Sequence, residues 1–374
     1  MPSFGVRGVP LVLAVCVAAC SDAPKQLTAP TSAIDRDLGS APLANATIHE
    51  IPALLNLTVN GINDSDEVSG DSGGRPFKWS PAHGIQWLST KGLLGAVATS
   101  ISNNGAVAGF AQAGDSNLTH AVVWLPSGTP HVFAMFPDSI NLPPEAGPAS
   151  CTAAAINVYG QLVGNCVIKD GFSSPVGFQW HGPTLSPPPG VPDNDVLTSI
   201  SDDGWIGGGD PGDVVVTTGA FITSPTGQTI LLKNHDGQPP STPSIVNAVT
   251  RHGWAAGLDF EGGCAQAVAW LASPGQSYPE FRMGTCGVAT GLTDDWYVVG
   301  TGTIGSNGSA FVWFPGPGLQ RLPGFGVSGE TSQAYAINAN HHVLGQITDG
   351  STVHTVIWYV GPRPTTVASA AATP

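Results

Sequence analysis

The feature that most limits the fold of this chain is a short pattern that occurs seven times, in what we call units 1 to 7. Each unit has a segment of small and apolar residues, a turn, and a glycine eight residues after the last apolar residue. The apolar residues are Ile62, Ile101, Ile156, Ile200, Val249, Leu292 and Ile337, and the glycines are Gly70, Gly109, Gly164, Gly208, Gly257, Gly300 and Gly345. A Trp ends the next strand-like segment in six units (Trp79, Trp124, Trp180, Trp270, Trp313 and Trp358), and the fourth unit has Thr223 instead. Markers in this fixed order, 39 to 55 residues apart, indicate a repeat architecture.

Each unit has room for four short strands separated by turns. Asn103-Asn104-Gly105 and Ser201-Asp202-Asp203-Gly204 are typical hairpin turns, because Asn and Asp bond their own backbone and Gly accepts a positive φ. The chain has 49 Gly and 33 Pro but only 10% charged residues, which excludes a coiled coil or a charged disordered chain. Four strands in about 45 residues predict a blade of a β-propeller, so the fold class we expect is an all-β, seven-bladed β-propeller with four antiparallel strands per blade.

The two ends of the repeat predict how the propeller closes. Unit 7 ends soon after Trp358 and lacks a fourth strand, whereas a strand-like segment, residues 48–55, precedes unit 1. Because a free strand edge has to be covered, we expect this N-terminal strand to complete the last blade. The propeller would then span residues 47–362, followed by a disordered tail, 363–374.

The units resemble a bacterial extracellular repeat family named HAF for its His-Ala-Phe motif. The matching segments include His120-Ala121-Val122-Val123-Trp124, Gly219-Ala220-Phe221 and Ser309-Ala310-Phe311-Val312-Trp313. The resemblance covers about residues 47–360. It implies an exported, propeller-like protein and supplies no catalytic residues.

The N-terminus is typical of an export signal. Arg7 precedes a short apolar stretch, residues 11–17, that is too short to span a bilayer. Val17-Ala18-Ala19-Cys20 is similar to the lipobox of bacterial lipoproteins, which implies cleavage of residues 1–19, lipidation of Cys20 and a flexible tether over 20–46. Ser21 favours sorting to the outer membrane by the same analogy. An ordinary secretory signal cleaved after Ala19 is the alternative.

Four further cysteines remain in the exported chain. Cys151 and Cys166 are centred on one predicted turn, and Cys264 and Cys286 on another, at Gly275. Facing residues of an antiparallel hairpin lie close enough for a disulfide, so we predict the bonds 151–166 and 264–286. Free or differently paired thiols are the alternative.

Acidic residues recur between the second and third strands of the units. They are Asp71, Asp115, Asp170, Asp210, Asp213, Asp259, Glu261 and Asp349. In a closed propeller these loops would gather on one face and could hold a cation or a basic ligand, whereas the simpler interpretation is that Asp is a solvated turn residue. No cofactor or metal motif occurs, and calcium at these loops is the one metal alternative. Near the first turn, Asp64 and Asp66 invite an EF-hand interpretation, but Val68 stands at the third ligand position and no Glu completes the pattern.

Three consecutive units have an aromatic residue three positions before the marker glycine: Trp205, Trp254 and Tyr297. Glu67, Ala106 and Gln161 take this position in the first three units and His342 in the seventh, which suggests a solvent-facing position. An exposed row of aromatic rings could stack on sugar rings. Packing between neighbouring blades is the alternative.

Charge and motifs limit the function. The formal net charge is −14, with no basic cluster, so nucleic acid is not an expected partner. No nucleophile elbow, catalytic Cys–His pair or phosphate loop is present. We therefore expect a non-enzymatic binding or scaffold propeller at the bacterial envelope, with carbohydrate or an envelope protein as partner and the lipid as its contact with the membrane. A polysaccharide hydrolase or lyase that uses carboxylates on the loop face and a subunit of an envelope assembly are the alternatives.

Overall fold

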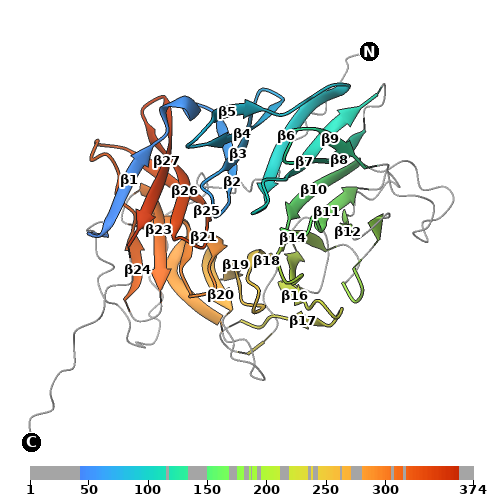
Figure 1. Cartoon of the computed structure of the whole chain (residues 1–374). Helices are drawn as coiled ribbons and strands as arrows, with labels where there is room; N and C mark the ends of the chain where they lie inside the picture. The colour runs from blue at the N-terminus through green and yellow to red at the C-terminus, as the bar shows by residue number, and fades with distance from the viewer. Residues whose placement is uncertain are drawn as a thin grey trace, which may run out of the picture. The chain divides into compact units, whose positions relative to one another are not determined.

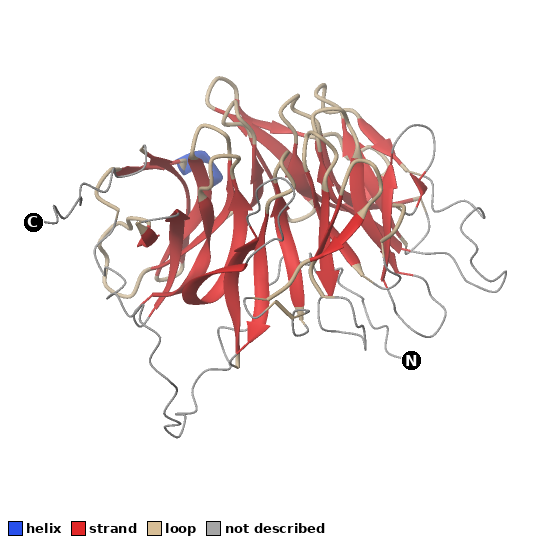
Figure 2. Cartoon of the chain, turned by 90° about the horizontal axis from the view of Figure 1, so that it is seen from below, coloured by secondary structure: helices blue, strands red, loops and turns tan. Residues whose placement is uncertain are grey.

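The computed structural model of the chain describes residues 43–114, 118–133, 150–167, 175–180, 185–186, 188–191, 195–210, 219–234, 237–238, 243–261, 263–270, 280–304, 307–314 and 317–361. Regular structure in these residues is nearly all β-strand, with one 3₁₀ helix, η1 (Pro52–Leu54) (Figure 2). The prediction of an all-β fold is confirmed. Cys20 and the segments 1–19 and 363–374 lie outside the described residues.

The described strands form five antiparallel sheets: four sheets of four strands coincide with units 1, 2, 3 and 7, and one sheet of eleven strands contains units 4 to 6, where strands of neighbouring units are hydrogen-bonded or continuous. Units 1 to 3 are β2 (Thr58–Ile62), β3 (Val68–Ser72), β4 (Arg75–Ser80) and β5 (Gly84–Trp87); β6 (Leu93–Ile101), β7 (Val107–Ala113), β8 (Thr119–Trp124) and β9 (Pro130–Val132); and β10 (Ser150–Ile156), β11 (Leu162–Val167), β12 (Pro175–Trp180) and β13 (Leu185–Ser186). Units 4 and 5 are β14 (Val196–Ile200), β15 (Ile206–Asp210), β16 (Phe221–Thr223) and β17 (Thr229–Leu231); and β18 (Ser244–Val249), β19 (Ala255–Glu261), β20 (Cys264–Trp270) and the first part of β21 (Glu280–Leu292). Unit 6 is the rest of β21 with β22 (Val298–Ile304), β23 (Asn307–Phe314) and β24 (Gly318–Arg321), and unit 7 is β25 (Thr331–Ile337), β26 (His342–Asp349), β27 (Thr352–Val360) and β1 (Ala46–Glu50).

The N-terminal strand β1 completes the last unit, as the sequence predicts. It pairs antiparallel with β27, from Ala46 opposite Val360 to Glu50 opposite Val356, so the blue and red ends of the chain lie side by side (Figure 1). This strand is shorter than expected, because Pro52 begins η1 and ends the pairing. Packing also begins earlier than the expected tether boundary, since Leu43 is 5% exposed and donates its backbone N–H to the carbonyl of Arg321.

The first strand of every unit has a β-bulge at the same place. The register shifts at Asn60, Thr99, Ala154, Thr198, Asn247, Thr290 and Tyr335, each two residues before the apolar marker of its unit. A bulge leaves one residue out of the ladder and redirects its side chain. In five units this side chain donates a hydrogen bond to the backbone of the next unit.

These bonds join the first strands of neighbouring units. Their acceptor is always the carbonyl of the residue before the next bulge: Asn60 to Ala98, Thr99 to Ala153, Thr198 to Val246, Asn247 to Ala289 and Thr290 to Ala334. Ala154 cannot donate, and Asn165 of β11 supplies the bond from unit 3, to the carbonyl of Leu197 at 2.8 Å. From unit 7, Gln346 donates to the carbonyl of Leu57 in unit 1 at 2.7 Å. The first strands also contact one another in succession, including β25 with β2.

The bulge explains the marker glycines. Each lies opposite the residue before the bulge, and a Cβ there would lie less than 3.0 Å from the carbonyl oxygen two residues before the bulge, such as Thr58 for Gly70 and Val288 for Gly300. A third-strand aromatic ring covers several of them, as Phe77 covers Gly70 and Phe311 covers Gly300. Any larger side chain would have to displace both the strand and the ring.

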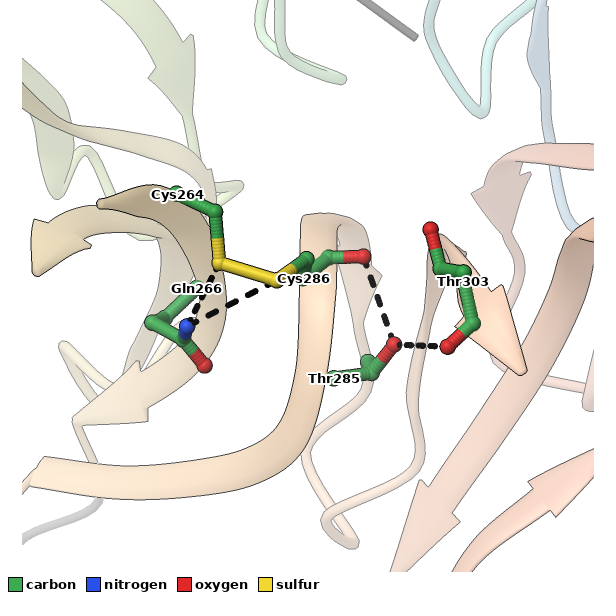
Figure 3. The surroundings of a disulfide bond; sticks show 5 residues. All are labelled: Cys264, Gln266, Thr285, Cys286 and Thr303. Atoms are coloured by element: carbon green, nitrogen blue, oxygen red, sulfur yellow. Dashed lines mark hydrogen bonds between the residues drawn. A yellow bond between two sulfur atoms is a disulfide. The ribbon is translucent and has the colours of Figure 1, made fainter. Parts of the chain in front are cut away.

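Both predicted disulfides are present. Cys151 and Cys166 face each other across β10 and β11. Cys264 and Cys286 are bonded diagonally, since Cys286 is in register with Gln266 rather than with Cys264. Gln266 lies over this bond, and Thr285 donates to the carbonyls of Cys286 and Thr303 (Figure 3). Because Gly287, the next residue, already pairs with β22, the disulfide fixes β21 where it passes from unit 5 to unit 6.

We predict that β1 is required for stability. A chain that begins at residue 51 lacks Leu43 and β1 and leaves β27 as an unpaired edge. A chain that begins at Leu43 retains both Leu43 and β1. Loss of the ladder and of buried Leu43 should lower the free energy of unfolding by at least about 3 kcal/mol and should promote association through the free edge. Urea unfolding and light scattering would measure the two effects, and equal stability of the two chains would contradict the assignment.

Candidate functional site

The acidic residues predicted between the second and third strands do not form a solvated face in the described part of the chain. Asp210 and Asp259 are fully buried, within β15 and β19, and both are in register with Ser244. Asp195, which precedes β14, is fully buried as well. Asp349 is half-buried in β26. Asp115, Asp170 and Asp213 lie outside the described residues, as does the side chain of Glu261.

The described residues include no group of three or more His, Cys, Asp or Glu side chains placed to hold a metal ion. Asp64 and Asp66, the residues that invited a calcium interpretation, instead hold neighbouring turns together. Asp64 accepts from the backbone N–H of Ala339 at 2.8 Å and from Asn103 at 2.8 Å. Asp66 accepts from Asn338 and contacts the ring of His342, at 2.9 and 2.7 Å. These bonds link unit 1 to unit 2 on one side and to unit 7 on the other.

The aromatic row is not exposed as a continuous surface. Tyr297 is 1% exposed and stacks on His341, with ring centroids 3.9 Å apart. Trp254 is half-buried and meets Trp296 edge to face at 5.2 Å. Trp205, also half-buried, covers Gly253, where a Cβ would come within 3.0 Å of the indole. All three fill the space between their own unit and the next, and the expectation of a solvent-facing position is wrong for Tyr297.

The Trp residues that end the third strands fill the same kind of space from the other side. Trp270 lies in one core cluster with Trp205, Trp313 with Trp254, and Trp358 with Tyr297. We call each such contact between consecutive units a junction. A junction has two filler positions: one is the position of Trp205, Trp254 and Tyr297, and the other is that of the Trp at the end of the third strand of the next unit. In junctions 4/5, 5/6 and 6/7 both filler positions are therefore aromatic.

Junction 3/4 has neither aromatic residue. Its filler positions are Gln161 and Thr223, and both line a pocket of about 440 Å³. Other lining residues come from unit 3 (Gln179, Trp180 and Pro188) and from unit 4 (Ile200, Ile206 and Pro225). Asp203, exposed in the first turn of unit 4, is the one acidic residue among them. The volume lies within the range of small-molecule sites, roughly 300–1,000 Å³.

Both departures are visible in the sequence, Thr223 in place of a Trp and Gln161 as a polar residue in the aromatic series, but no pattern in the sequence connects them. They are 62 positions apart in the chain, and only the contact between units 3 and 4 brings them to one place.

Comparisons with known proteins give the following. No family model and no curated protein matches the chain. Among solved structures, it is similar to TolB from Acinetobacter baumannii (13% identity, TM-score 0.39, 60% of this chain and 55% of TolB). It is similar also to a chain of a mitotic checkpoint complex (13%, 0.45, 91% and 98%) and to the β-propeller domain of Cps50 (Swd1) from Myceliophteria thermophila (12%, 0.46, 85% and 99%). The chain thus spans about half the length of TolB. At such identities function has to be argued from the site itself.

Asp71 is expected to make stability depend on pH. Burial raises the pKa of its carboxyl from 3.8 to about 6. Between these values the folded chain binds the proton more tightly than the unfolded chain, so this residue's contribution to stability falls as pH rises from about 4 to about 6. Asp71→Asn should therefore be more stable than the wild type above pH 6, on the order of 1 kcal/mol because the carboxyl is partly solvated.

The difference should shrink below pH 4, where the wild-type carboxyl is protonated in both states. Urea unfolding from pH 3.5 to 8 measures it. Asp349→Asn, which removes one charge from the equivalent region of unit 7, controls for net charge. A difference between Asp71→Asn and the wild type that does not vary with pH would show that burial of the carboxylate is not its cause.

Proposed function

We propose that this chain is a non-enzymatic binding or scaffold protein of the bacterial envelope, built as a closed seven-bladed β-propeller and anchored by a lipid on Cys20. Carbohydrate or an envelope protein is the proposed partner. The observation that carries the proposal is the pocket at junction 3/4, the junction in which both filler positions lack an aromatic residue. A pocket between two packed units is suited to holding a ligand.

The junction bonds support a closed propeller. Each unit donates a side-chain hydrogen bond to the next, and the bond from Gln346 to Leu57 joins unit 7 to unit 1. The turns repeat this connection, since Asn338 donates to the carbonyl of Asn63 at 2.9 Å. Interactions that run from each unit to the next and return to the first are what a ring requires.

The composition of the pocket favours binding over hydrolysis. Glycoside hydrolysis requires two carboxyl groups on either side of the scissile bond. The described lining supplies one, Asp203, and the buried Asp195, Asp210 and Asp259 do not line this pocket. The amides of Gln161 and Gln179 and the ring of Trp180 are groups that orient a ligand without chemistry.

Binding is tested by a thermal-shift panel on the purified chain. It should include oligosaccharides from bacterial and plant polymers, and calcium with an EDTA control. A ligand that binds the folded state stabilises it and raises the melting temperature. At a ligand concentration of a hundred times the dissociation constant, the free energy of unfolding rises by about 2.7 kcal/mol. We expect a shift with at least one sugar class and no cleavage products. A flat panel, together with no envelope protein cross-linked to the chain, would contradict the binding function.

The anchor is tested by cell fractionation. Among the described residues no helix is both long and apolar enough to span a membrane. In the proposed anchor, the lipid on Cys20 holds the protein to the membrane. Cys20→Ala should move the protein from the membrane fraction to the soluble fraction, because loss of both acyl chains removes stable anchoring. Cys16→Ala, four residues earlier in the apolar stretch, is the matched control and should remain with the membranes. If Cys20→Ala also remains there, the lipid anchor is wrong.

A further inference from the structure

Junction 3/4, which contains the pocket and which we call the open junction, lacks a tryptophan side chain that the three junctions after it contain. In junctions 4/5, 5/6 and 6/7 the filler position at the end of the third strand holds an indole: Trp270, Trp313 and Trp358 are 0%, 8% and 0% exposed. The same position in junction 3/4 is Thr223, at the end of β16. Since the third strand ends at the same place in each unit, the pocket occupies space that an indole fills elsewhere in this protein.

In other units the indole at this position also donates a hydrogen bond, so the missing indole of junction 3/4 concerns a hydrogen-bond acceptor as well as a volume. Three third-strand Trp side chains donate their ring N–H to a backbone carbonyl of the preceding unit, Trp124 to Ser89, Trp270 to Lys233 and Trp358 to Pro323, at 2.9, 2.9 and 2.7 Å. Each acceptor lies two residues after the end of a fourth strand, β5, β17 or β24.

The equivalent residue of unit 3 is Pro188, two residues after the end of β13. Pro188 lines the pocket. Its carbonyl accepts a long bond, 3.4 Å, from the backbone N–H of Val191. A carbonyl oxygen has two lone pairs, so it can accept a second donor from a ring in the pocket.

The remaining walls suit a flat ring. Trp180, whose ring also packs edge to face on Phe133 of unit 2, and Pro225 give the lining apolar rings, and such rings pack against aromatic surfaces. Gln161 and Gln179 are the amide residues of the lining, and exposed Asp203 disfavours an anionic ligand. A ring of indole size leaves part of the 440 Å³ for a substituent.

We propose that the pocket at junction 3/4 binds a planar aromatic ring with an N–H donor, an indole or a heterocycle of that size, in the place of the missing Trp side chain. This inference rests on the proposed binding function and assigns it a site and a ligand class. The ring would lie between Gln161 and Thr223 and donate its N–H to the carbonyl of Pro188. The ring could belong to a free heterocycle or to a Trp side chain of a peptide, and the two share this recognition.

Indole itself is the first probe, used with the full chain. Saturation-transfer NMR and isothermal titration calorimetry should detect binding with a dissociation constant on the order of 1 mM or tighter, as expected for a ligand of this size. Indene has the same shape without the N–H and should bind about tenfold more weakly. N-acetyltryptophanamide distinguishes the two sources: binding at least as tight as that of indole supports a peptide-borne ring, and weaker binding supports a free heterocycle.

Thr223→Trp places the indole of the other units into the pocket. It should raise the melting temperature and weaken indole binding at least tenfold. Thr223→Val keeps the volume and the opening, so it is the matched control and should bind indole within about threefold of the wild type. If Thr223→Trp does not fold, Gln161→Trp fills the same pocket from unit 3 and should have the same effect on indole.

The inference would be overturned if indole does not bind up to its solubility limit, or binds a folded filling variant as well as the wild type. Those results are separate from the test of the general function. A sugar or protein ligand without indole binding would leave the binding function standing and reject this ligand class. Indole binding with an otherwise flat panel would support the pocket and replace carbohydrate as the ligand.

Discussion

The fold depends on one recurring interaction, the hydrogen bond from a side chain of one unit to the first strand of the next. A sheet with an apolar face has to bury that face against another element, so each unit has to pack against its neighbours. Here the residue displaced by the bulge, such as Thr290, reaches the carbonyl of Ala334 in the following unit at 2.9 Å. One bond of this kind contributes about 1 kcal/mol, but its repetition from the bulged residue of five units gives the first strands of these units and of the units that follow them the same contact.

The bulge has a second consequence, which determines residues elsewhere in the unit. It brings a carbonyl oxygen close to the second strand, so that strand needs glycine at the marker position. A third-strand Phe, or Trp358 in unit 7, packs over the glycine in five units. The bulge at Asn60, the glycine at position 70 and the ring of Phe77 thus depend on one another, although they lie on three strands. Unit 3 shows how far this arrangement tolerates change, because Ala154 lacks a donor and Asn165 of the second strand replaces it.

The sequence was sufficient for features that are local or periodic. The seven units, the strand β1 beside β27 and both disulfide pairs follow from spacing and turn chemistry within the chain. Features that depend on contact between units could not be predicted. Other units have polar residues at the position equivalent to Tyr297, which suggests exposure. Tyr297 is nevertheless buried, because His341 from the next unit stacks on it. Asp210 and Asp259 look like solvated turn residues, but Asp210 is the last residue of β15, Asp259 lies inside β19, and both are buried. The pocket could not be predicted for the same reason, since Gln161 and Thr223 line one pocket only because units 3 and 4 are in contact.

The open junction is compatible with a stable frame for a physical reason. A dry cavity of this volume would be costly, at about 24 cal/mol per Å³, whereas a site with polar walls can be filled by water that bonds to them. Gln161, Gln179, Asp203 and Thr226 are polar residues of its lining, and Asp203 and Thr226 are exposed to solvent. Water held by a few polar groups beside the ring of Trp180 is also what an aromatic ligand with one donor can displace at small cost, because its N–H replaces a bond of the water and its faces bury apolar surface. The same walls therefore explain how the gap is tolerated in the free protein and why a ring with an N–H fits it better than a purely apolar one.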